Sequence, residues 1–256
     1  MKRIRALVLL TFGTVLCSRG QPPLPFYWTT PGLTPDFGQQ YLIQWGTNWC
    51  APTSAADSLF WLSQNGNPGL WQWYLPGDNT GASNIISELG AYMGTDPDLG
   101  TSDGGIVAGL QDYLGLYGGG QAYNVSLTYA TDVGGGLGLF IDMQTELYSG
   151  QDVLPLITWT SGEGHVVEMT GWYGADITIN DPATDPYNLN WSNENLMVDT
   201  TSWKANGVAI TYATGTGVID GFVDISPVPE PGTLSLVGVG VVVFLRRARN
   251  PKNWAR

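Results

Sequence analysis

The chain has 256 residues, enough for one large domain or two small ones, and its 43% apolar and 12% charged side chains exclude an intrinsically disordered protein. Between Gln21 and Leu245 it carries all 22 of its acidic residues but only one basic residue, Lys204. Because a body this acidic repels phosphate backbones and anionic lipid headgroups, nucleic-acid binding is excluded.

The first 20 residues have the pattern of a secretory signal peptide. Three basic residues among the first five precede an apolar stretch from Ala6 to Leu16, which is too short to span a membrane. Small residues follow and predict cleavage after Gly20. A lipoprotein signal acylated at Cys17 is the alternative, but Leu16 stands immediately before it, where such a signal needs a small residue. We therefore expect export across the inner membrane.

Apolar residues recur at helical spacing in four segments, which crowd toward the first half of the body. The spacing predicts helices over Ala51–Gln64, Ala82–Met93, Gly105–Tyr117 and Leu137–Tyr148. In the first helix one apolar stripe is formed by Ala51, Ala55, Leu59 and Leu62. Pro52 fits the first turn of that helix, where its missing N–H is harmless.

The second half changes to short β-branched or aromatic runs bounded by turn residues. These runs predict strands over Val153–Thr160, His165–Tyr173, Asp176–Asn180, Val208–Tyr212 and Val218–Asp224. The segment from Pro182 to Asn195 has no period, and we expect a surface loop there. Helices first and strands afterwards favour an α+β fold with N-terminal helices packed on a C-terminal antiparallel sheet. Residues 21–226 are expected to form this one domain.

The mature body has one thiol and one imidazole, those of Cys50 and His165. Cys17 leaves with the signal peptide, so no intramolecular disulfide is expected, and the odd cysteine indicates an intermolecular bridge or a reactive thiol. Cys50 stands directly before the first predicted helix, where the helix dipole and an imidazolium both favour the nucleophilic thiolate. Taken alone, a cysteine or a histidine in such a place is more often part of a core.

Two further polar residues stand at suitable distances from this pair. Gln44 lies six residues before Cys50, where its amide can stabilise an oxyanion together with the backbone N–H of Cys50. Asp181 lies sixteen residues after His165, at the end of the next predicted strand, where it can hold the imidazole. Asn180 competes for that role, but neighbours on a strand point to opposite faces, and we favour Asp181.

At these positions the chain resembles the papain-like cysteine peptidases that trim double-glycine leaders from bacteriocin precursors. The matching stretches are Gln44–Thr53, Leu147–Leu156, Gly164–Gly171 and Asn180–Ala183. The resemblance implies a papain-like fold with Cys50 as nucleophile, His165 as general base and acid, Asp181 as orienting residue and Gln44 as oxyanion donor. Nothing in the sequence resembles the transporter to which the leader-trimming enzymes are fused, so a leader peptide does not follow as substrate.

The C-terminal residues 227–256 have the pattern of a second targeting segment. Pro229-Glu230-Pro231 is followed by an apolar run from Thr233 to Leu245, thirteen residues long, and then by a basic cluster. A helix of that length reaches about 20 Å, short of the ~30 Å hydrocarbon core, and the basic cluster should stay cytoplasmic. The pattern resembles the PEP-CTERM sorting tail, which implies transient membrane association and removal by an exosortase-type transpeptidase. A simple C-terminal anchor is the alternative.

The sequence thus favours an exported cysteine peptidase acting on a peptide or protein at the cell surface or in the extracellular matrix. If an amine instead of water resolves the thioester, the same residues make a transpeptidase or transamidase. The competing class is a non-catalytic matrix or surface protein that retains the fold, which the acidic, aromatic-rich body also fits. No cofactor is required by these functions, and one histidine with one mature cysteine cannot build a zinc site.

Overall fold

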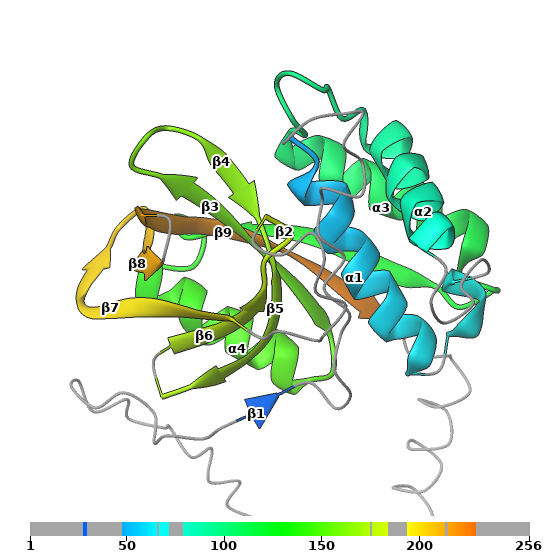
Figure 1. Cartoon of the computed structure of the whole chain (residues 1–256). Helices are drawn as coiled ribbons and strands as arrows, with labels where there is room; N and C mark the ends of the chain where they lie inside the picture. The colour runs from blue at the N-terminus through cyan, green and yellow to red at the C-terminus, as the bar shows by residue number, and fades with distance from the viewer. Residues whose placement is uncertain are drawn as a thin grey trace, which may run out of the picture.

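Figure 1 shows the computed structural model of the chain, which describes residues 28–29, 48–65, 67–71, 79–174, 176–183, 194–212 and 215–228. The predicted signal peptide, Gln44 and the predicted sorting tail from Pro229 onward lie outside the described residues. Within these ranges no helix is long and apolar enough to cross a membrane.

The four predicted helices are confirmed, with the expected last residues and with first residues one to three positions earlier. They are α1 (Cys50–Gln64), α2 (Asn79–Met93), α3 (Asp103–Tyr117) and α4 (Gly136–Tyr148), and a short 3₁₀ helix, η2 (Pro68–Leu70), follows α1. Figure 1 shows α1, α2 and α3 grouped on one side of the molecule, whereas α4 lies among the strands on the other side.

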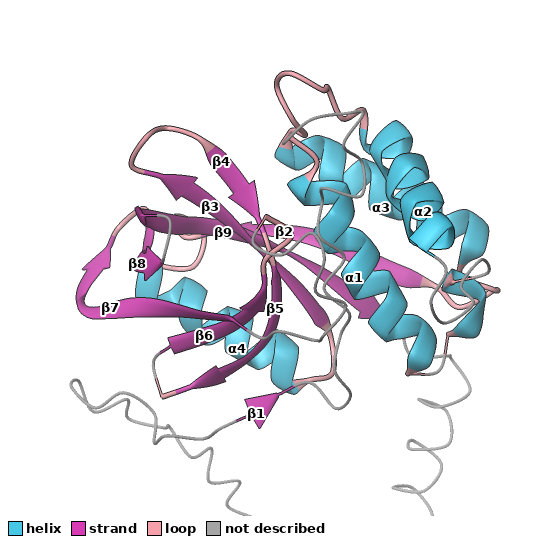
Figure 2. Ribbon diagram, in the orientation of Figure 1, coloured by secondary structure: helices cyan, strands magenta, loops and turns pink. Residues whose placement is uncertain are grey.

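The strands form one antiparallel sheet, drawn in magenta in Figure 2. In chain order they are β1 (Trp28–Thr29), β2 (Tyr123–Tyr129), β3 (Asp152–Trp159), β4 (Gly164–Val166), β5 (Glu168–Tyr173), β6 (Asp176–Asn180), β7 (Glu194–Lys204), β8 (Gly207–Tyr212) and β9 (Gly215–Pro227). Strands β5, β6, β7, β8, β9 and β3 pair in that order, and Val153 of β3 pairs with Met169 of β5. This last pairing closes a six-stranded barrel, to which β1, β2 and β4 are added.

The sequence predicted the α+β class and the antiparallel sheet, but three strands, β1, β2 and β7, were missed, and the predicted strand His165–Tyr173 is divided into β4 and β5. The prediction that all the helices precede the strands is wrong, because β2 stands between α3 and α4 in the chain. Its residues alternate apolar and polar from Tyr123 to Tyr129, which is a period-two signal. The predicted loop from Pro182 to Asn195 is wrong at its end, because β7 begins at Glu194 and pairs with β6.

Helix α1 is buried on every side instead of along the one predicted stripe. Every residue from Ala51 to Ser63 is buried. The helix contacts α2, α3 and η2 on one side and β3, β4 and β5 on the other. Small side chains at Ser54, Ala55, Ala56 and Ser58 permit this close packing, because they leave room for the strands to approach. A helix enclosed on all sides is a rigid support for whatever its first residue carries.

Two apolar cores lie on the two faces of β3. Leu154 and Leu156 belong to the core shared with α1, α2 and α3, whereas Val153 and Ile157 belong to the core inside the barrel. The alternation of side chains along a strand explains this division. α4 contributes Leu139, Phe140, Met143 and Leu147 to the barrel core. α4 therefore packs with the barrel and does not join the other helices, contrary to the predicted layering.

The last strand ends in a fixed position. The backbone N of Val228 donates to the carbonyl of Ala122 over 2.8 Å, and the side chain of Gln121 donates to the carbonyl of Val228 over 2.7 Å. Both partners precede β2, which pairs with β9 along its whole length. The body is thus held by hydrogen bonds up to the residue before Pro229.

Two glycines of α3 should respond oppositely to alanine. A Cβ on Gly109 would lie 2.5 Å from Cγ and 2.6 Å from the backbone N of Met93, whereas at Gly115 nothing lies within 4 Å. We expect Gly109→Ala to lower the free energy of unfolding by roughly 1–3 kcal/mol through overpacking. Gly115→Ala should raise it by roughly 0.5–1 kcal/mol through helix propensity. Chemical denaturation measures both, and equal effects would contradict this α2–α3 packing.

Candidate active site

Cys50 is the first residue of α1, and its side chain is partly exposed as a free thiol. The carbonyl of Trp49, the residue before it, accepts hydrogen bonds from the backbone N and the hydroxyl of Thr53 at 3.2 and 2.7 Å. The first turn contains no acidic residue. A thiolate at this position therefore faces the positive end of the helix without a competing carboxylate on that turn.

His165 and Asp181 form a charged pair on the barrel. Nε2 of His165, in β4, lies 2.8 Å from Oδ1 of Asp181, and the two side chains are 10% and 2% exposed. Oδ1 of Asp181 also accepts a hydrogen bond from the backbone N of Ala183 over 2.8 Å, which fixes the carboxylate. Because Nε2 is engaged by Asp181, Nδ1 is the ring nitrogen left to face another group.

The strand register explains how residues sixteen positions apart meet. Glu168 of β5 pairs with Asn180 of β6, so Asp181 lies just beyond this pair, beside the turn of chain that joins β4 to β5. The neighbouring Asn180 side chain points elsewhere and donates to Oε2 of Glu168 over 2.8 Å, with both side chains buried. Asp181, and not Asn180, is therefore the residue that contacts the imidazole of His165.

Burial and hydrogen bonding act in opposite directions on His165. Burial disfavours the imidazolium and lowers its pKa, whereas hydrogen bonds to Asp181 and Cys50, with the negative charge of both partners, raise the pKa. The raising contributions prevail, so the pKa of His165 reaches about 10 against an ordinary value of 6.5. The arrangement favours an imidazolium at neutral pH, placed between the Asp181 carboxyl group and the Cys50 sulfur.

One hydrogen bond joins the two elements that carry this pair. The hydroxyl of Ser54, one turn after Cys50 in α1, donates to the carbonyl of Val166, the residue after His165, over 3.0 Å in a fully buried setting. The bond crosses from the helical side to the barrel side of the molecule. It fixes the position of the first turn of α1 along β4. This position in turn determines the distance between the Cys50 thiol and the His165 imidazole.

An aromatic side chain covers the imidazole. The ring of Trp159, in β3, stacks on His165 with centroids 6.2 Å apart and planes inclined by 27°. Trp159 in turn stacks on Tyr212 of β8, with centroids 6.3 Å apart. These contacts restrict rotation of the histidine ring and limit the access of water to the His165–Asp181 hydrogen bond. Trp159 and His165 lie on neighbouring antiparallel strands separated by a short turn, so their spacing in the sequence indicates that they could meet.

Farther along α1 a buried carboxyl lies at the same junction. Asp152, the first residue of β3, is fully buried. Its burial raises the pKa to about 7, against the smaller lowering effect of the nearby Ser58 hydroxyl and Val153 backbone N–H. Among the described residues only His165 and Lys204 can carry positive charge. The junction between α1 and β3 therefore holds a carboxyl group that is partly protonated near neutral pH.

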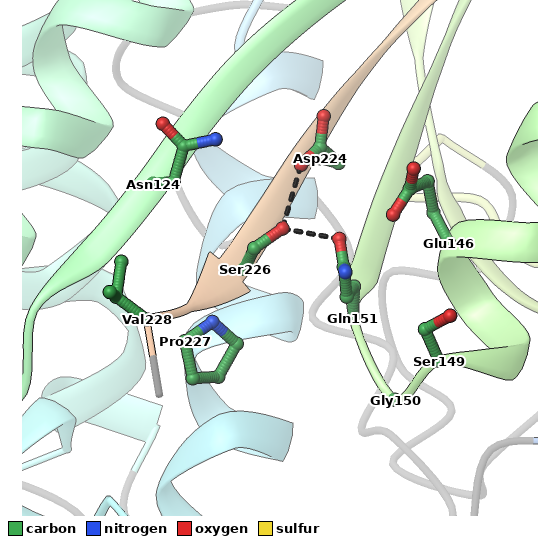
Figure 3. A pocket seen from close by; sticks show the side chains of 9 residues that line it. All are labelled: Asn124, Glu146, Ser149, Gly150, Gln151, Asp224, Ser226, Pro227 and Val228. Carbon is green, nitrogen blue, oxygen red and sulfur yellow. Dashed lines mark hydrogen bonds between the residues drawn. The ribbon is translucent and has the colours of Figure 1, made fainter. Parts of the chain in front are cut away.

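A separate pocket of about 580 Å³ opens where β9 and α4 end (Figure 3). It is lined by Asn124, Glu146, Ser149, Gly150, Gln151, Asp224, Ser226, Pro227 and Val228. The Ser226 hydroxyl lies 2.8 Å from Oδ2 of Asp224 and is hydrogen-bonded to Gln151. Burial, together with the charges of Asp224 and Asp142, raises the pKa of Glu146. The lining includes none of Cys50, His165 and Asp181, so the pocket is not their cleft.

Three of the four residues singled out in the sequence thus lie together. Cys50 comes from the helical side, whereas His165 and Asp181 come from the barrel side. Gln44 lies outside the described residues, and its role as oxyanion donor stays a prediction. Sequence reasoning did not single out Ser54 as part of the site. Its signal in the sequence is the helical spacing of the polar residues Ser54, Asp57 and Ser58, which begins one turn after the cysteine.

Comparison with known proteins bears mainly on the C-terminus. Residues 227–250 match the PEP-CTERM protein-sorting motif, which confirms the predicted tail and indicates export and sorting to the cell surface or beyond by an exosortase-type enzyme. No curated protein matches the chain. The crystal structure of the Pseudomonas avirulence protein AvrPphB aligns with a TM-score of 0.30 and 13% identity over 65% of this chain and 80% of that one. A match at this TM-score supports no conclusion about the function of this chain.

The lone histidine should titrate far above its ordinary range. We expect an NMR titration of the His165 ring to show a pKa near 10, because Asp181 and Cys50 stabilise the imidazolium. Asp181→Asn removes one negative partner and should lower this pKa by at least one unit, roughly the effect of one close opposite charge. Asp176→Asn, at the other end of β6, is the matched control and should leave the pKa unchanged. A wild-type value near 6.5 would contradict the geometry.

Asp152 should make the fold less stable at alkaline pH. Its pKa is about 7 in the folded chain against 3.8 as the ordinary value, so the folded state holds the proton more tightly. The resulting stabilisation is complete below the lower value and is lost as pH rises through the higher one. Between about pH 5 and 8, the free energy of unfolding of the wild type should therefore fall more steeply than that of Asp152→Asn. The control Asp199→Asn, at an exposed site, should not flatten the profile.

Proposed function

We propose that the chain is an exported cysteine peptidase with a papain-like arrangement of its site. The observation that carries this proposal is the contact of the His165 imidazole with the Asp181 carboxylate on one side and with the Cys50 thiol on the other. A thiol and an imidazole in hydrogen-bond contact can form the ion pair that cysteine nucleophiles use. The sorting tail supports an extracellular location for the proposed reaction.

In the first half of the reaction the Cys50 thiolate adds to the carbonyl carbon of a peptide bond. The oxygen of the tetrahedral intermediate becomes negative and is stabilised by the Cys50 backbone N–H and by the Gln44 amide. The intermediate collapses when the C–N bond breaks and His165 gives its proton to the departing amine. An acyl thioester on Cys50 and a neutral imidazole remain.

In the second half the neutral imidazole of His165 takes a proton from water, which adds to the thioester carbonyl. The C–S bond then breaks, so that a carboxylic acid product leaves and the thiolate–imidazolium pair is restored. Throughout, Asp181 holds Nε2 of the imidazole and keeps Nδ1 directed at the reacting sulfur. Asp181 acts by orienting the imidazole and is held itself by the backbone N of Ala183.

The acceptor of the acyl group distinguishes two versions of this function. With water the product is a free carboxylate, whereas a primary amine gives a new amide, as in a transpeptidase or transamidase. The same residues serve both reactions. Mass spectrometry of products formed in the presence of an added amine separates them, because the amide product is heavier than the acid by a known increment.

A mechanism-directed label tests whether the thiol is active. A papain-directed epoxide should modify Cys50 of the folded wild type, because an activated thiolate opens the epoxide ring while the imidazolium protonates its oxygen. His165→Ala should reduce the rate by at least about a hundredfold, within the usual range for loss of a catalytic acid or base. Peptide mapping by mass spectrometry locates the label.

Cys50→Ser provides the control for this experiment and should show no label. Asp176→Asn, a carboxylate removed from the far end of β6, should react like the wild type. If the folded wild type does not react, the proposed peptidase function fails, and the chain is better described as a non-catalytic surface or matrix protein.

A further inference from the structure

The residue two positions before Cys50 is bound to a different part of the molecule. The side-chain amide of Asn48 donates both of its N–H groups to the loop that follows α2. Nδ2 lies 3.0 Å from the carbonyl oxygen of Pro97 and 2.9 Å from that of Asp98. An amide nitrogen has two hydrogens, so its donor capacity is fully used.

The loop that receives Asn48 is held by hydrogen bonds of its own. Asp96 and Gly100 exchange two backbone hydrogen bonds of 2.9 and 2.8 Å, and the Asp96 carboxylate accepts from the backbone N of Asp98 and Leu99 at 2.8 and 3.0 Å. Gly100 closes the turn with φ +81°, which glycine adopts without strain. The two carbonyls therefore stand as a preformed acceptor pair.

The chain leading into Cys50 depends on such anchors, because α1 lacks a side-chain cap at its start. Trp49, the N-cap residue, lies against α2, where a Cβ on Gly90 would come within 2.1 Å of its ring. Asn48 and Trp49 are thus held from the helical side, by α2 and the loop after it. His165, in contrast, is held from the barrel side by Asp181 and Trp159.

We propose that Asn48 is a positioning residue that fixes the Cys50 sulfur and backbone N–H against His165; this inference rests on the proposed function. Nucleophile and base come from opposite sides of the molecule, so each must be immobilised on its own side for the proton to pass between them. The two hydrogen bonds of Asn48 supply that immobilisation next to the nucleophile. Displacements of about 1 Å at a reacting group reduce rates by about a hundredfold.

The test compares Asn48→Ala with Asn65→Ala in the full chain carrying Cys17→Ser, so that Cys50 is the only thiol. Asn65 is a matched control, because its Nδ2 also donates to a backbone carbonyl, that of Trp61 over 2.9 Å, at the far end of α1. Asn48→Asp serves as a second variant that keeps the side-chain size but has no N–H to donate. Thermal unfolding shows whether each variant is folded.

Two rates are measured, epoxide inactivation and alkylation of Cys50 by iodoacetamide over a range of pH. We expect both Asn48 variants to lower the first-order rate of epoxide inactivation by tenfold to a hundredfold, with less change in epoxide binding. Their alkylation at acidic pH should fall toward that of His165→Ala, because a displaced thiol loses its imidazolium partner. Asn65→Ala should match the wild type in both measurements.

The outcomes separate the two proposals. Wild-type rates in folded Asn48→Ala or Asn48→Asp would overturn the positioning role while the peptidase proposal stands. Equal losses in Asn48→Ala and Asn65→Ala would also overturn it, because they would indicate a general loss of stability. If the wild type resists the epoxide, the peptidase proposal fails, and the pH profile of alkylation alone then supports or overturns the role of Asn48 in fixing the thiol.

Discussion

The site depends on the place where a buried helix meets the rim of a barrel. α1 is enclosed by other helices and by strands, so it cannot turn or slide without breaking both faces of its packing. The Ser54–Val166 hydrogen bond fixes its position along β4. Cys50 and His165 are each next to this bond in structure, one turn before Ser54 and one residue before Val166. This buried polar contact between α1 and β4 therefore contributes directly to the geometry of the pair.

The charge of the body supports the same pair. His165 and Lys204 are the only described side chains that can be cationic, and acidic residues surround them in the sequence. A cation in such a setting is stabilised by its partners and by the general negative field. The acidic body and the raised pKa of the one histidine are thus consistent with each other. The effect on Asp152 is the reverse for an acid. Burial raises the pKa of its carboxyl group to about 7, so that its neutral form is favoured.

Much of the site could be predicted from sequence because it depends on residues in one helix and in consecutive strands. The helix start at Cys50 follows from periodicity, and the meeting of His165 with Asp181 follows from two short strands joined by a tight turn. The barrel could not be predicted, because its closure rests on the pairing of Val153 with Met169, and no sequence period reports such a contact. For the same reason α4 was expected beside the other helices, although its apolar residues lie in the barrel core.

The fixed end of β9 limits how far the body can travel. Val228 is tied down by two hydrogen bonds, and four residues, Pro229 to Gly232, separate it from the apolar run of the tail. Fully extended, four residues span about 13 Å. Until an exosortase-type enzyme removes the tail, the folded body is therefore held within about this distance of the apolar run. Removal of the tail releases the body from this constraint, so the sorting reaction also determines how far the body can move from the apolar segment.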